Sequence, residues 1–469
     1  FNKVSLQSQV YTPRWVVEFL VNNSLGKLYL EMYPTSNIRQ RYKIAKPPQK
    51  QLRKPKPIEE IRIIDPACGS GNFLLYAFDL FYELYLDQAE NFGADYEEDE
   101  IPQLILENNL YGIDLDDRSI QLAQLGLYVK AKSKNRNLEA PGFKVVSSDF
   151  YLPDFDTVRP LFEDESKLDD EIIHLLQEIW ADLQNAHRFG SLLRIEEKVN
   201  NKIVKLQEKP DDLFTGLNIQ LFSDFKREFF PRIKEAVRQY TGDKATSFLK
   251  GKTLDALTYL QVISQKYEVS VTNPPYTDSG DFGAELKDFV NKNYKLPNKF
   301  STNLYAAFFK RCHDLTEDEG KIAMVHPPTF MYIKTFEDVR KFMINKTHIH
   351  LFVEWGYLGM FNPKARVDSA MYVLEKGNFE GDTIFIKLNN LYETKRYDAL
   401  FEAYEAELSG EDHKLLYHLP QSKLKLIKGW PFIYWISDGF REKFKAQILD
   451  KKLDIRAGIQ TSNNNRFLR

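Results

Sequence analysis

A strand, a glycine turn and a helix follow one another early in the chain, and this order limits the possible folds more than any other feature. The apolar run at 61–64 leads into Asp-Pro-Ala-Cys-Gly-Ser-Gly at 65–71, and a helix is predicted from 73 to about 85. Glycines in such a turn let the backbone approach a ligand at the N-terminus of the helix. The pattern predicts an α/β fold with a ligand-binding turn after this strand.

The glycine turn does not match the common phosphate-binding motifs. It lacks the G-x-G-x-x-G spacing, and no G-K-[ST] follows it. Asp65, at the end of the strand, places a carboxylate where a cationic amino group could bind. The turn therefore favours a zwitterionic, nucleoside-bearing ligand over a triphosphate. An ordinary strand-to-helix turn is the alternative.

Two further predicted strands are also followed by carboxylates. The strand at 110–114 ends in Asp114, and the strand at 143–146 is soon followed by Asp149. In doubly wound folds, an acid at the end of the second strand accepts hydrogen bonds from the ribose hydroxyls of a nucleotide. Each acid alone could be a helix cap, but acids at successive strand ends favour one shared ligand.

A proline motif, Asn273-Pro274-Pro275-Tyr276, follows the apolar run at 269–272. The two prolines fix φ and remove two backbone donors, which makes a stiff ledge at the end of a strand. The side-chain oxygen of Asn273 and the carbonyl of Pro274 could each accept one N–H of an exocyclic amine, and Tyr276 could stack on the ring that carries it. A proline-rich turn without further function is the alternative.

Two helix starts can be recognised from their capping residues. Thr12 is predicted as an N-cap, with Pro13 as the first helical residue. Asp116 and Asp117 are predicted to start the helix at 118–130 through capping and the helix dipole. The first helix is expected to be amphipathic.

The strand–helix alternation stops between 156 and 266, where helical periods take over. We expect four parts: an N-terminal helix and cofactor-binding half at 1–155, a helical insertion at 156–266, a catalytic half at 267–400, and a linker with the beginning of another domain at 401–469. The insertion could be a lid, a DNA-facing lobe or a docking surface.

Further strands are predicted in the catalytic half. They lie at 320–325, 349–353 and 367–374, and a core helix is predicted at 303–315. His326, which follows the first of these strands, is predicted to be structural.

Composition sets limits on the partners and the compartment. The 469 residues suffice for two or three domains, and no apolar run approaches the length of a membrane span. Two cysteines make no disulfide framework, so a cytoplasmic location is expected. A net charge of -3 predicts no general attraction to nucleic acid, so DNA binding would use local basic surfaces. One such surface is the proline- and Lys/Arg-rich run at 34–57, a loop that could touch phosphates or be merely solvated. Because the chain opens on Phe1 and stops at Arg469 in a polar stretch, we expect a piece of a longer protein.

In this order the motifs resemble those of the S-adenosylmethionine-dependent N6-adenine DNA methyltransferases of the γ arrangement. There the cofactor motifs precede the catalytic motif, and a target-recognition domain follows. The motifs that carry the resemblance are Tyr11-Thr12-Pro13, residues 65–71, Asp114, Asp149 and Asn273-Pro274-Pro275-Tyr276.

Within this group, the chain is most similar to the large methyltransferase of BREX and phage-growth-limitation defence systems, the PglX type. This narrower resemblance rests on residues 12–17, 23–26, 107–114 and 458–469. DISARM-type and type IIG restriction enzymes share much of the same pattern.

The resemblance implies a Rossmann-like methyltransferase sheet with helices on both faces, a large helical insertion and the start of a target-recognition domain. It implies S-adenosylmethionine as the cofactor, and double-stranded DNA and other subunits of a defence complex as partners. Neither a metal nor a membrane is implied. The site is expected to transfer a methyl group to a flipped-out adenine by direct, in-line displacement.

The resemblance also assigns roles to individual residues. The methionine part of the cofactor is lined by the first segment and the glycine turn: Tyr11, Thr12, Pro13, Pro66, Ala67, Gly69 and Gly71, with Asp65 shaping the turn and Asn273 nearby. Asp114 binds the ribose hydroxyls, Leu115 packs on the adenine, and Asp149 and Phe150 contact it. Asn273 and Pro274, backed by Pro275, accept from the target amine, and the flipped base lies between Tyr276 and Phe361. The gap between Asp65 and Asp114 is longer than the roughly twenty residues usual for such folds.

Other functions remain open. An Asn-Pro-Pro-Tyr site also occurs in protein glutamine methyltransferases, because a side-chain amide offers the same planar NH2, and RNA is another substrate with such amines. A third alternative is a methyltransferase-like subunit that binds DNA or partners and is active only in a defence complex.

Overall fold

The computed structural model describes most of the chain between residues 11 and 445. The described residues exclude 140–141, 151, 153, 158, 160–169, 199–246, 358, 362–366 and 378–380. The predicted domain start at 458–469 therefore lies outside the described residues, as does most of the segment that follows Phe361.

One mixed sheet organises the described residues. Its nine strands lie in the order β3-β2-β1-β4-β5-β7-β6-β8-β9. The strands are β1 Ile63–Asp65, β2 Leu110–Asp114, β3 Lys144–Ser147, β4 Tyr267–Thr272, β5 Thr316–His326, β6 Thr347–Tyr357, β7 Asp368–Lys376, β8 Asp382–Lys387 and β9 Leu416–Pro420.

The strands from β3 to β5 run parallel, so their carboxyl ends meet at one edge of the sheet. Strand β7 is antiparallel to both β5 and β6, which leaves β6 pointing the same way as β5. β6 is parallel to β8, and β9 is antiparallel to β8. The edge where β1, β2, β3, β4 and β5 end is called the carboxyl edge below.

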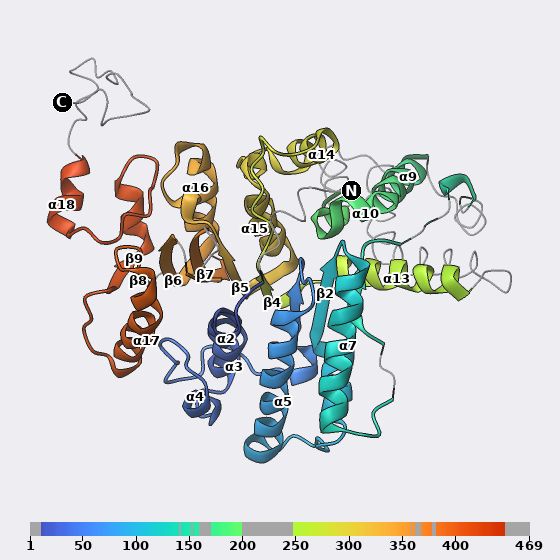
Figure 1. Cartoon of the computed structure of the whole chain (residues 1–469), viewed down its shortest axis with the longest axis horizontal. Coiled ribbons are helices and arrows are strands. Elements are labelled where there is room, and N and C mark those ends of the chain that lie inside the picture. The colour runs from blue at the N-terminus through green and yellow to red at the C-terminus, as the bar shows by residue number, and fades with distance from the viewer. Residues whose placement is uncertain are drawn as a thin grey trace, which may run out of the picture.

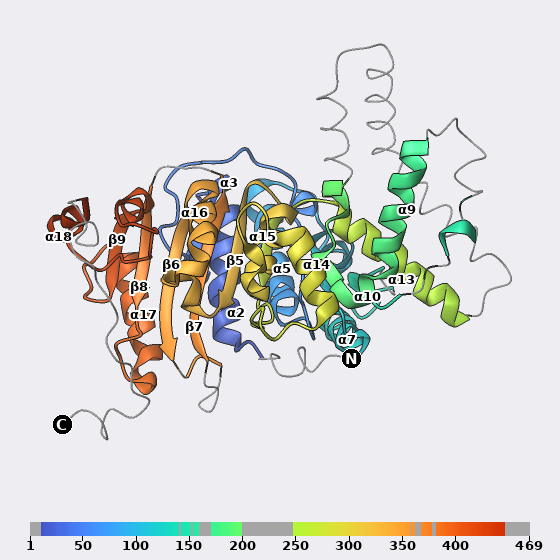
Figure 2. The same ribbon diagram turned by 90° about the horizontal axis from the view of Figure 1, so that it is seen from above.

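Helices cover both faces of the sheet (Figure 1). One layer holds α2 Arg14–Val21, α5 Asn72–Phe92, α7 Asp117–Lys134 and α17 Glu393–Ser409. The other holds α13 Ser247–Ser264, α14 Ala284–Tyr294, α15 Leu304–Leu315 and α16 Glu337–Lys346, of which the last three lie in front of the strands in Figure 2. The other α-helices in the described residues are α3 Lys27–Met32, α4 Ile38–Arg41, α6 Ile101–Leu104, α9 Asp170–Gln184, α10 Ala186–Phe189 and α18 Asp438–Glu442. Among the described residues, no helix is both long and apolar enough to span a membrane.

Burial on both faces explains why β5 is apolar throughout at 322–325 rather than alternating. In β5, Ala323 and Val325 belong to the core under the α2 and α5 layer, whereas Ile322 and Met324 belong to the core under α15 and α16. The expected α/β sheet with helices on both faces is thus confirmed.

Most predicted elements are present, with longer bounds. The helix after the glycine turn continues to Phe92, where Gly93 ends it in a left-handed conformation. Asp116 caps α7 as expected, because its side chain accepts from the backbone N–H of Arg118 at 3.2 Å. Strands β8 and β9 were not predicted. Because β9 belongs to the same sheet, the sheet continues past residue 400, the predicted end of the catalytic half, and α17 spans that residue. The division into four parts remains a prediction.

The prediction that Thr12 caps the first helix is wrong. The helix α2 begins at Arg14, its N-cap is Pro13, and no side chain caps it. The Thr12 hydroxyl instead faces β4, where it has a partner described below.

The insertion packs on the sheet through the described residues of α9, α10 and α13. Ile179, Trp180, Tyr259 and Ile263 are buried there with Ile113 of β2. Figure 2 shows α9, α10 and α13 together at the end of the molecule where β2 and α7 lie.

The basic run at 34–57 is mostly irregular, as predicted, but several of its cations already have carboxylate partners. Arg53 binds Glu31 and Glu375, and Lys56 binds Glu268. Arg41 and Lys43 pair with acids on α5 and α17. All four side chains connect the loop to the body of the protein, although Arg41 and Lys43 remain more than half exposed.

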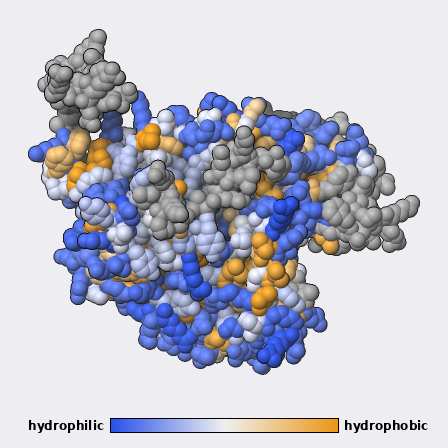
Figure 3. Space-filling model, in the orientation of Figure 1, coloured by the Kyte–Doolittle hydropathy of each residue, from blue (hydrophilic) through white to orange (hydrophobic). Residues whose placement is uncertain are grey.

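One exposed apolar stripe lies on α7. Leu122, Leu125 and Val129 follow one another at helical spacing, and each is between 57% and 59% exposed. Figure 3 shows apolar colour at the lower right, where α7 lies in Figure 1.

Candidate active site

The glycine turn between β1 and α5 has a backbone that glycine alone adopts easily. Gly69 has φ +51° and Gly71 has φ +84°. A Cβ on Gly71 would lie 2.9 Å from the Cβ of Ala123 on α7. The N–H of Cys68 donates to the carbonyl of Ile113 at 3.0 Å, which ties the turn to β2.

Asp114 at the end of β2 braces the same turn. Its Oδ2 accepts from the N–H of Gly69 at 2.8 Å, and its Oδ1 accepts from the N–H of Asp116 at 3.0 Å. Burial raises the pKa of this carboxyl above its usual range. Because β1 and β2 are paired, with Asp65 opposite Gly112, the long gap between Asp65 and Asp114 does not separate them in space.

Asp65 lies inside the turn and only 1% of it is exposed. Its Oδ1 accepts from the N–H of Ala67 at 3.0 Å. Burial raises the pKa of Asp65 to about 7, although the hydrogen bond from the Ala67 N–H opposes this shift. The residue therefore shapes the turn from within.

The residues after β2 and β3 meet the helical insertion. Leu115 packs against Gly190, where a Cβ would lie 3.2 Å from the Leu115 Cδ2. The ring of Phe150 lies 5.0 Å from the ring of Tyr259, centroid to centroid. The side chain of Asp149 is exposed, so it is open to a ligand from solvent.

The ledge after β4 is held by hydrogen bonds to distant parts of the chain. Asn273 donates from Nδ2 to the Oγ1 of Thr12 at 2.9 Å. The hydroxyl of Tyr276 donates to the Asn273 Oδ1, and it lies 3.4 Å from the carbonyl of Val325 on β5. Asn303 donates to the Tyr276 carbonyl at 3.3 Å and also caps α15. The side-chain amide of Asn273 is thereby fixed in one orientation, with Pro274 buried next to it.

The aromatic ring of Tyr276, which belongs to the ledge, lies near the ring of Phe361. The ring centroids of Tyr276 and Phe361 are 6.4 Å apart, and the rings are tilted by 44°. Burial raises the pKa of Tyr276 above its usual range, so the phenol stays neutral and can donate its proton in a hydrogen bond. The structure thus brings together the two residues expected to flank a base.

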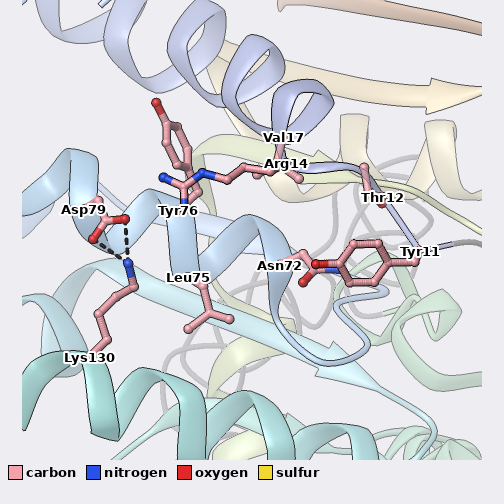
Figure 4. Close-up of a pocket in the computed structure, with 9 residues that line it drawn as sticks. All are labelled: Tyr11, Thr12, Arg14, Val17, Asn72, Leu75, Tyr76, Asp79 and Lys130. Carbon is pink, nitrogen blue, oxygen red and sulfur yellow. Dashed lines mark hydrogen bonds and ion pairs between the residues drawn. The ribbon is translucent and has the colours of Figure 1, made fainter. Parts of the chain in front are cut away.

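A pocket of about 220 Å³ lies between the start of α2 and the helices α5 and α7 (Figure 4). Its lining joins Tyr11 and Thr12 to Asn72, the residue that follows the glycine turn. Lys130 and Asp79, which also line the pocket, form an ion pair. The pocket therefore connects Tyr11 and Thr12 to the first residue of α5, and Tyr11 is 70% exposed beside it.

His326 has the structural role predicted for it. It is 1% exposed, its ring stacks on Tyr305 at 4.3 Å, and its Nε2 lies 2.7 Å from the Tyr372 hydroxyl. Burial lowers the pKa of His326 to about 4.

One group of side chains among the described residues has the spacing of metal ligands, namely Glu31, His350 and Glu375. The ammonium of Lys321 already lies between the carboxylates, 2.7 Å from Glu31 and 2.6 Å from Glu375. The lysine supplies the positive charge that a metal ion would bring, so this cluster is a buried ion-pair network.

Sequence reasoning missed three residues near the site: Ser191, Tyr259 and Asn303. Ser191 and Tyr259 lie in the insertion, and their partners Pro66 and Phe150 are more than a hundred positions away. Only Asn303 left a signal, since an asparagine before the predicted core helix is a typical N-cap.

With the geometry described, the comparisons with known proteins can be stated. The family model of the Eco57I restriction-modification methylases matches residues 108–361, more than half of the chain. The chain belongs to the Eco57I restriction-modification methylase family. The matched region runs from the strand that ends in Asp114 to Phe361 and includes the ledge. The model of the MmeI DNA-methyltransferase domain matches residues 42–153.

Two curated relatives of this Eco57I-family chain align with nearly all of it. The adenine-specific methyltransferase PglX of Lacticaseibacillus casei (strain Zhang) is 28% identical over 98% of the chain and 37% of its own length. The adenine-specific methyltransferase BrxX of Escherichia coli O9:H4 (strain HS) is 26% identical over 93% of the chain and 35% of its own length. These relatives confirm the resemblance to the PglX type. The chain spans about a third of the length of the curated relatives it matches.

Among solved structures, the ATP-dependent Type ISP restriction-modification enzyme LlaBIII bound to DNA aligns with a TM-score of 0.49. The sequence identity is 13%, and the alignment covers 92% of the Eco57I-family chain and 23% of the other.

Proposed function

We propose that this chain is the catalytic part of a site-specific DNA adenine-N6 methyltransferase that uses S-adenosylmethionine, and that it acts in a BREX-like or restriction-modification defence system. One observation carries the proposal. The Asn273 amide, oriented by Thr12 and Tyr276, lies at the carboxyl edge beside the glycine turn. A methyl donor in that turn and an amine on the ledge would then lie next to each other.

The residues of the carboxyl edge fit the cofactor. An ionised carboxylate has about four acceptor positions, and Asp114 accepts from the backbone N–H groups of Gly69 and Asp116. The same carboxylate can also accept from a ribose hydroxyl. The methionine end is assigned to the pocket between Tyr11, Thr12 and Asn72, and the adenine to Leu115, Asp149 and Phe150.

The ledge fits an exocyclic amine. An amide oxygen can accept two hydrogen bonds, so the bond from the Tyr276 hydroxyl to the Asn273 Oδ1 is compatible with a second one from the adenine N6 amine. The Pro274 carbonyl can accept the other N–H of that amine. These two acceptors hold the amine so that its nitrogen lone pair points away from them, toward the methyl donor.

The mechanism follows from these positions. The target adenine must leave the duplex, which costs a few kcal/mol. Stacking on Tyr276 and Phe361 returns about 1–3 kcal/mol per base. When bound, S-adenosylmethionine supplies an activated methyl group. The chain contributes by orienting and polarising the amine through Asn273 and Pro274.

A second candidate is a methyltransferase-like subunit that is active only within a larger assembly. It is supported by the coverage of the relatives, since the chain corresponds to 37% and 35% of their lengths. DNA recognition and partner binding in such an assembly would involve the parts of those relatives that the alignments do not cover. A protein glutamine or RNA methyltransferase has no comparable support.

The test uses the longest available form of the protein. It is incubated with labelled S-adenosylmethionine and duplex DNA, and the DNA is digested to nucleosides. N6-methyladenine that is absent with Asn273→Ala supports the proposal. Cofactor binding without label supports the second candidate, and addition of purified partner subunits should then restore transfer. Label in RNA or in a protein glutamine, with none in DNA, would refute both.

A further inference from the structure

Part of the helical insertion is built into the carboxyl edge. Residues 186–195, called the bridge segment here, comprise α10, the 3-10 turn Gly190–Leu192 and the three residues after it. Ser191 is 2% exposed, and its hydroxyl donates to the carbonyl of Pro66 at 2.5 Å. Pro66 belongs to the glycine turn, so a side chain of the insertion holds the backbone of that turn.

The bridge segment also reaches the residues that follow β2 and β3. Gly190 has φ +54° and ψ −137°, a conformation that residues with a Cβ rarely adopt, and it packs on Leu115. Its carbonyl accepts from the Tyr259 hydroxyl at 2.8 Å. The Tyr259 ring in turn packs on Phe150. Gly190 and Tyr259 therefore support both hydrophobic side chains that are assigned to the cofactor adenine.

Contacts on the other side attach the bridge segment to the helices that follow the ledge. Phe189 stacks on Phe289 of α14, with ring centroids 3.8 Å apart and planes within 8°. The hydroxyl of Tyr294 donates to the Leu192 carbonyl at 2.7 Å. The fully buried Arg311 of α15 donates to the Ser191 carbonyl at 2.6 Å. The bridge segment is thus attached to α14 and α15, which follow the ledge, and it also contacts the residues that are assigned to the cofactor.

We propose that the bridge segment completes the cofactor site. Ser191 is a positioning residue for the glycine turn, and Gly190 with Tyr259 positions Leu115 and Phe150 for the adenine of the cofactor. The insertion therefore serves S-adenosylmethionine binding, a role that neither a lid nor a DNA-facing lobe would require. This inference rests on the proposed function, because it assumes that S-adenosylmethionine binds at the carboxyl edge.

The test compares two variants that each remove one buried hydroxyl, either on the bridge segment or bonded to it. Ser191→Ala removes the bond to Pro66, and Tyr294→Phe removes the bond to Leu192 on the target side. Loss of one hydrogen bond that orders a ligand loop corresponds to a rise in the dissociation constant for S-adenosylmethionine of roughly five- to tenfold. We expect this rise for Ser191→Ala and less than about a twofold change for Tyr294→Phe.

Calorimetric titration with S-adenosylmethionine and thermal unfolding without it give the two readouts. A raised dissociation constant for Ser191→Ala that exceeds any change in Tyr294→Phe supports the inference, as does a KM effect for the cofactor with kcat unchanged. Equal dissociation constants for Ser191→Ala and the wild type, with only a lower Tm, would overturn it. If the wild type itself does not bind S-adenosylmethionine, the proposed function fails first.

Tyr259→Phe provides a second variant that keeps the ring against Phe150. It removes only the hydroxyl that binds the Gly190 carbonyl. We expect a smaller rise in the dissociation constant, about two- to fivefold, because the packing on Phe150 remains. An unchanged constant here would show that Gly190 needs no fixing from α13, and that part of the inference would be withdrawn.

Discussion

The side chain of Asn273 donates a 2.9 Å hydrogen bond to the hydroxyl of Thr12, which is 261 positions earlier in the chain. Thr12 is 5% exposed and belongs to the segment that lines the pocket beside the glycine turn. The residue assigned to the target amine is therefore oriented by a residue assigned to the cofactor. This bond couples the two halves of the site, and it explains why Thr12 does not cap α2.

Thr12→Val tests that coupling, because valine keeps the shape of threonine but cannot accept the Asn273 N–H. The amide would lose one of the contacts that fix it, at about 1 kcal/mol, so we expect kcat to fall roughly five- to tenfold. Thr12→Ser keeps the hydroxyl and should stay within about twofold of the wild type. Steady-state methylation of duplex DNA measures both. Equal kcat values for the two variants would show that the Thr12 hydroxyl does not orient Asn273.

Asn273→Ala removes the side-chain acceptor for the target amine. In other enzymes, loss of one side chain that hydrogen-bonds to the transition state lowers kcat on the order of 10²–10³-fold. We expect at least that loss of methyl transfer, with cofactor binding nearly intact because the glycine turn and Asp114 remain. Asn293→Ala on α14 is the matched control, since that amide donates to the Phe289 carbonyl of its own helix rather than to a residue of the site. Parallel loss of transfer and of cofactor binding in Asn273→Ala would contradict the division of roles.

The sequence was sufficient to find the carboxyl edge because its signals are local. Asp65, Asp114 and the ledge each follow directly on an apolar strand, and parallel strands bring such positions together. Roles that depend on tertiary contacts could not be predicted from the sequence. Thr12 resembled a helix cap because threonine before proline favours one, but the hydrogen bond to Asn273 determines its orientation.

The bridge segment and the last two strands were missed for a similar reason. Ser191 is an ordinary serine in the sequence, and its role depends on a contact with Pro66 across 125 positions. Strands β8 and β9 are short and separated by the long helix α17, so they gave no continuous strand pattern. The pairing of each of these two strands is determined by the sheet that they join rather than by local β-strand propensity.

Gly71→Ala should disturb the turn in two ways. A residue other than glycine at φ +84° costs about 1 kcal/mol, and the new Cβ would lie 2.9 Å from the Cβ of Ala123. Gly93→Ala is the matched control, because Gly93 has φ +71° with nothing within 4 Å of the added Cβ. We expect Gly71→Ala to lose about 1–3 kcal/mol more than the control in urea unfolding. It should also weaken S-adenosylmethionine binding, which Gly93→Ala should leave unchanged.

The buried carboxyl of Asp65 should make the free energy of unfolding depend on pH. Burial raises its pKa to about 7, whereas an unfolded aspartate ionises near about 3.9. Between these values the folded chain holds a proton that the unfolded chain has released, so the stabilisation is present below about pH 4 and is lost as the pH rises through 7. Asp65→Asn removes this loss. Relative to the wild type, the variant should gain about 2–3 kcal/mol in the free energy of unfolding between pH 5 and pH 8.

Urea unfolding at several pH values measures this difference. Asp318→Asn is the control, since the Asp318 side chain is 92% exposed and its replacement leaves the buried Asp65 carboxyl in place. A wild-type and Asp65→Asn difference that is independent of pH would show that the Asp65 carboxyl is already ionised in the folded chain.

We expect Lys321 to contribute strongly to the free energy of unfolding, because its buried ammonium pairs with two buried carboxylates. Its side chain is fully buried, and its ammonium lies within 2.7 Å of both Glu31 and Glu375. Although burial opposes the shift, the hydrogen bond from His350 and the charge of Lys321 lower the pKa of Glu375, so both carboxylates are charged. Lys321→Met would leave two buried negative charges, both of which still pair with Arg53. We expect a loss on the order of 3 kcal/mol in the free energy of unfolding.

Lys43→Met is the matched control, because Lys43 pairs with Glu405 on the surface and is 51% exposed. Such a pair contributes under about 1 kcal/mol, so urea unfolding should barely distinguish this variant from the wild type. Similar losses in the two lysine variants would mean that solvent reaches the cluster around Lys321. In that case a double variant, Lys321→Met with Glu375→Gln, would recover little stability. If the cluster is as dry as the structure shows, the second substitution removes one of the unpaired charges and should restore about half of the loss.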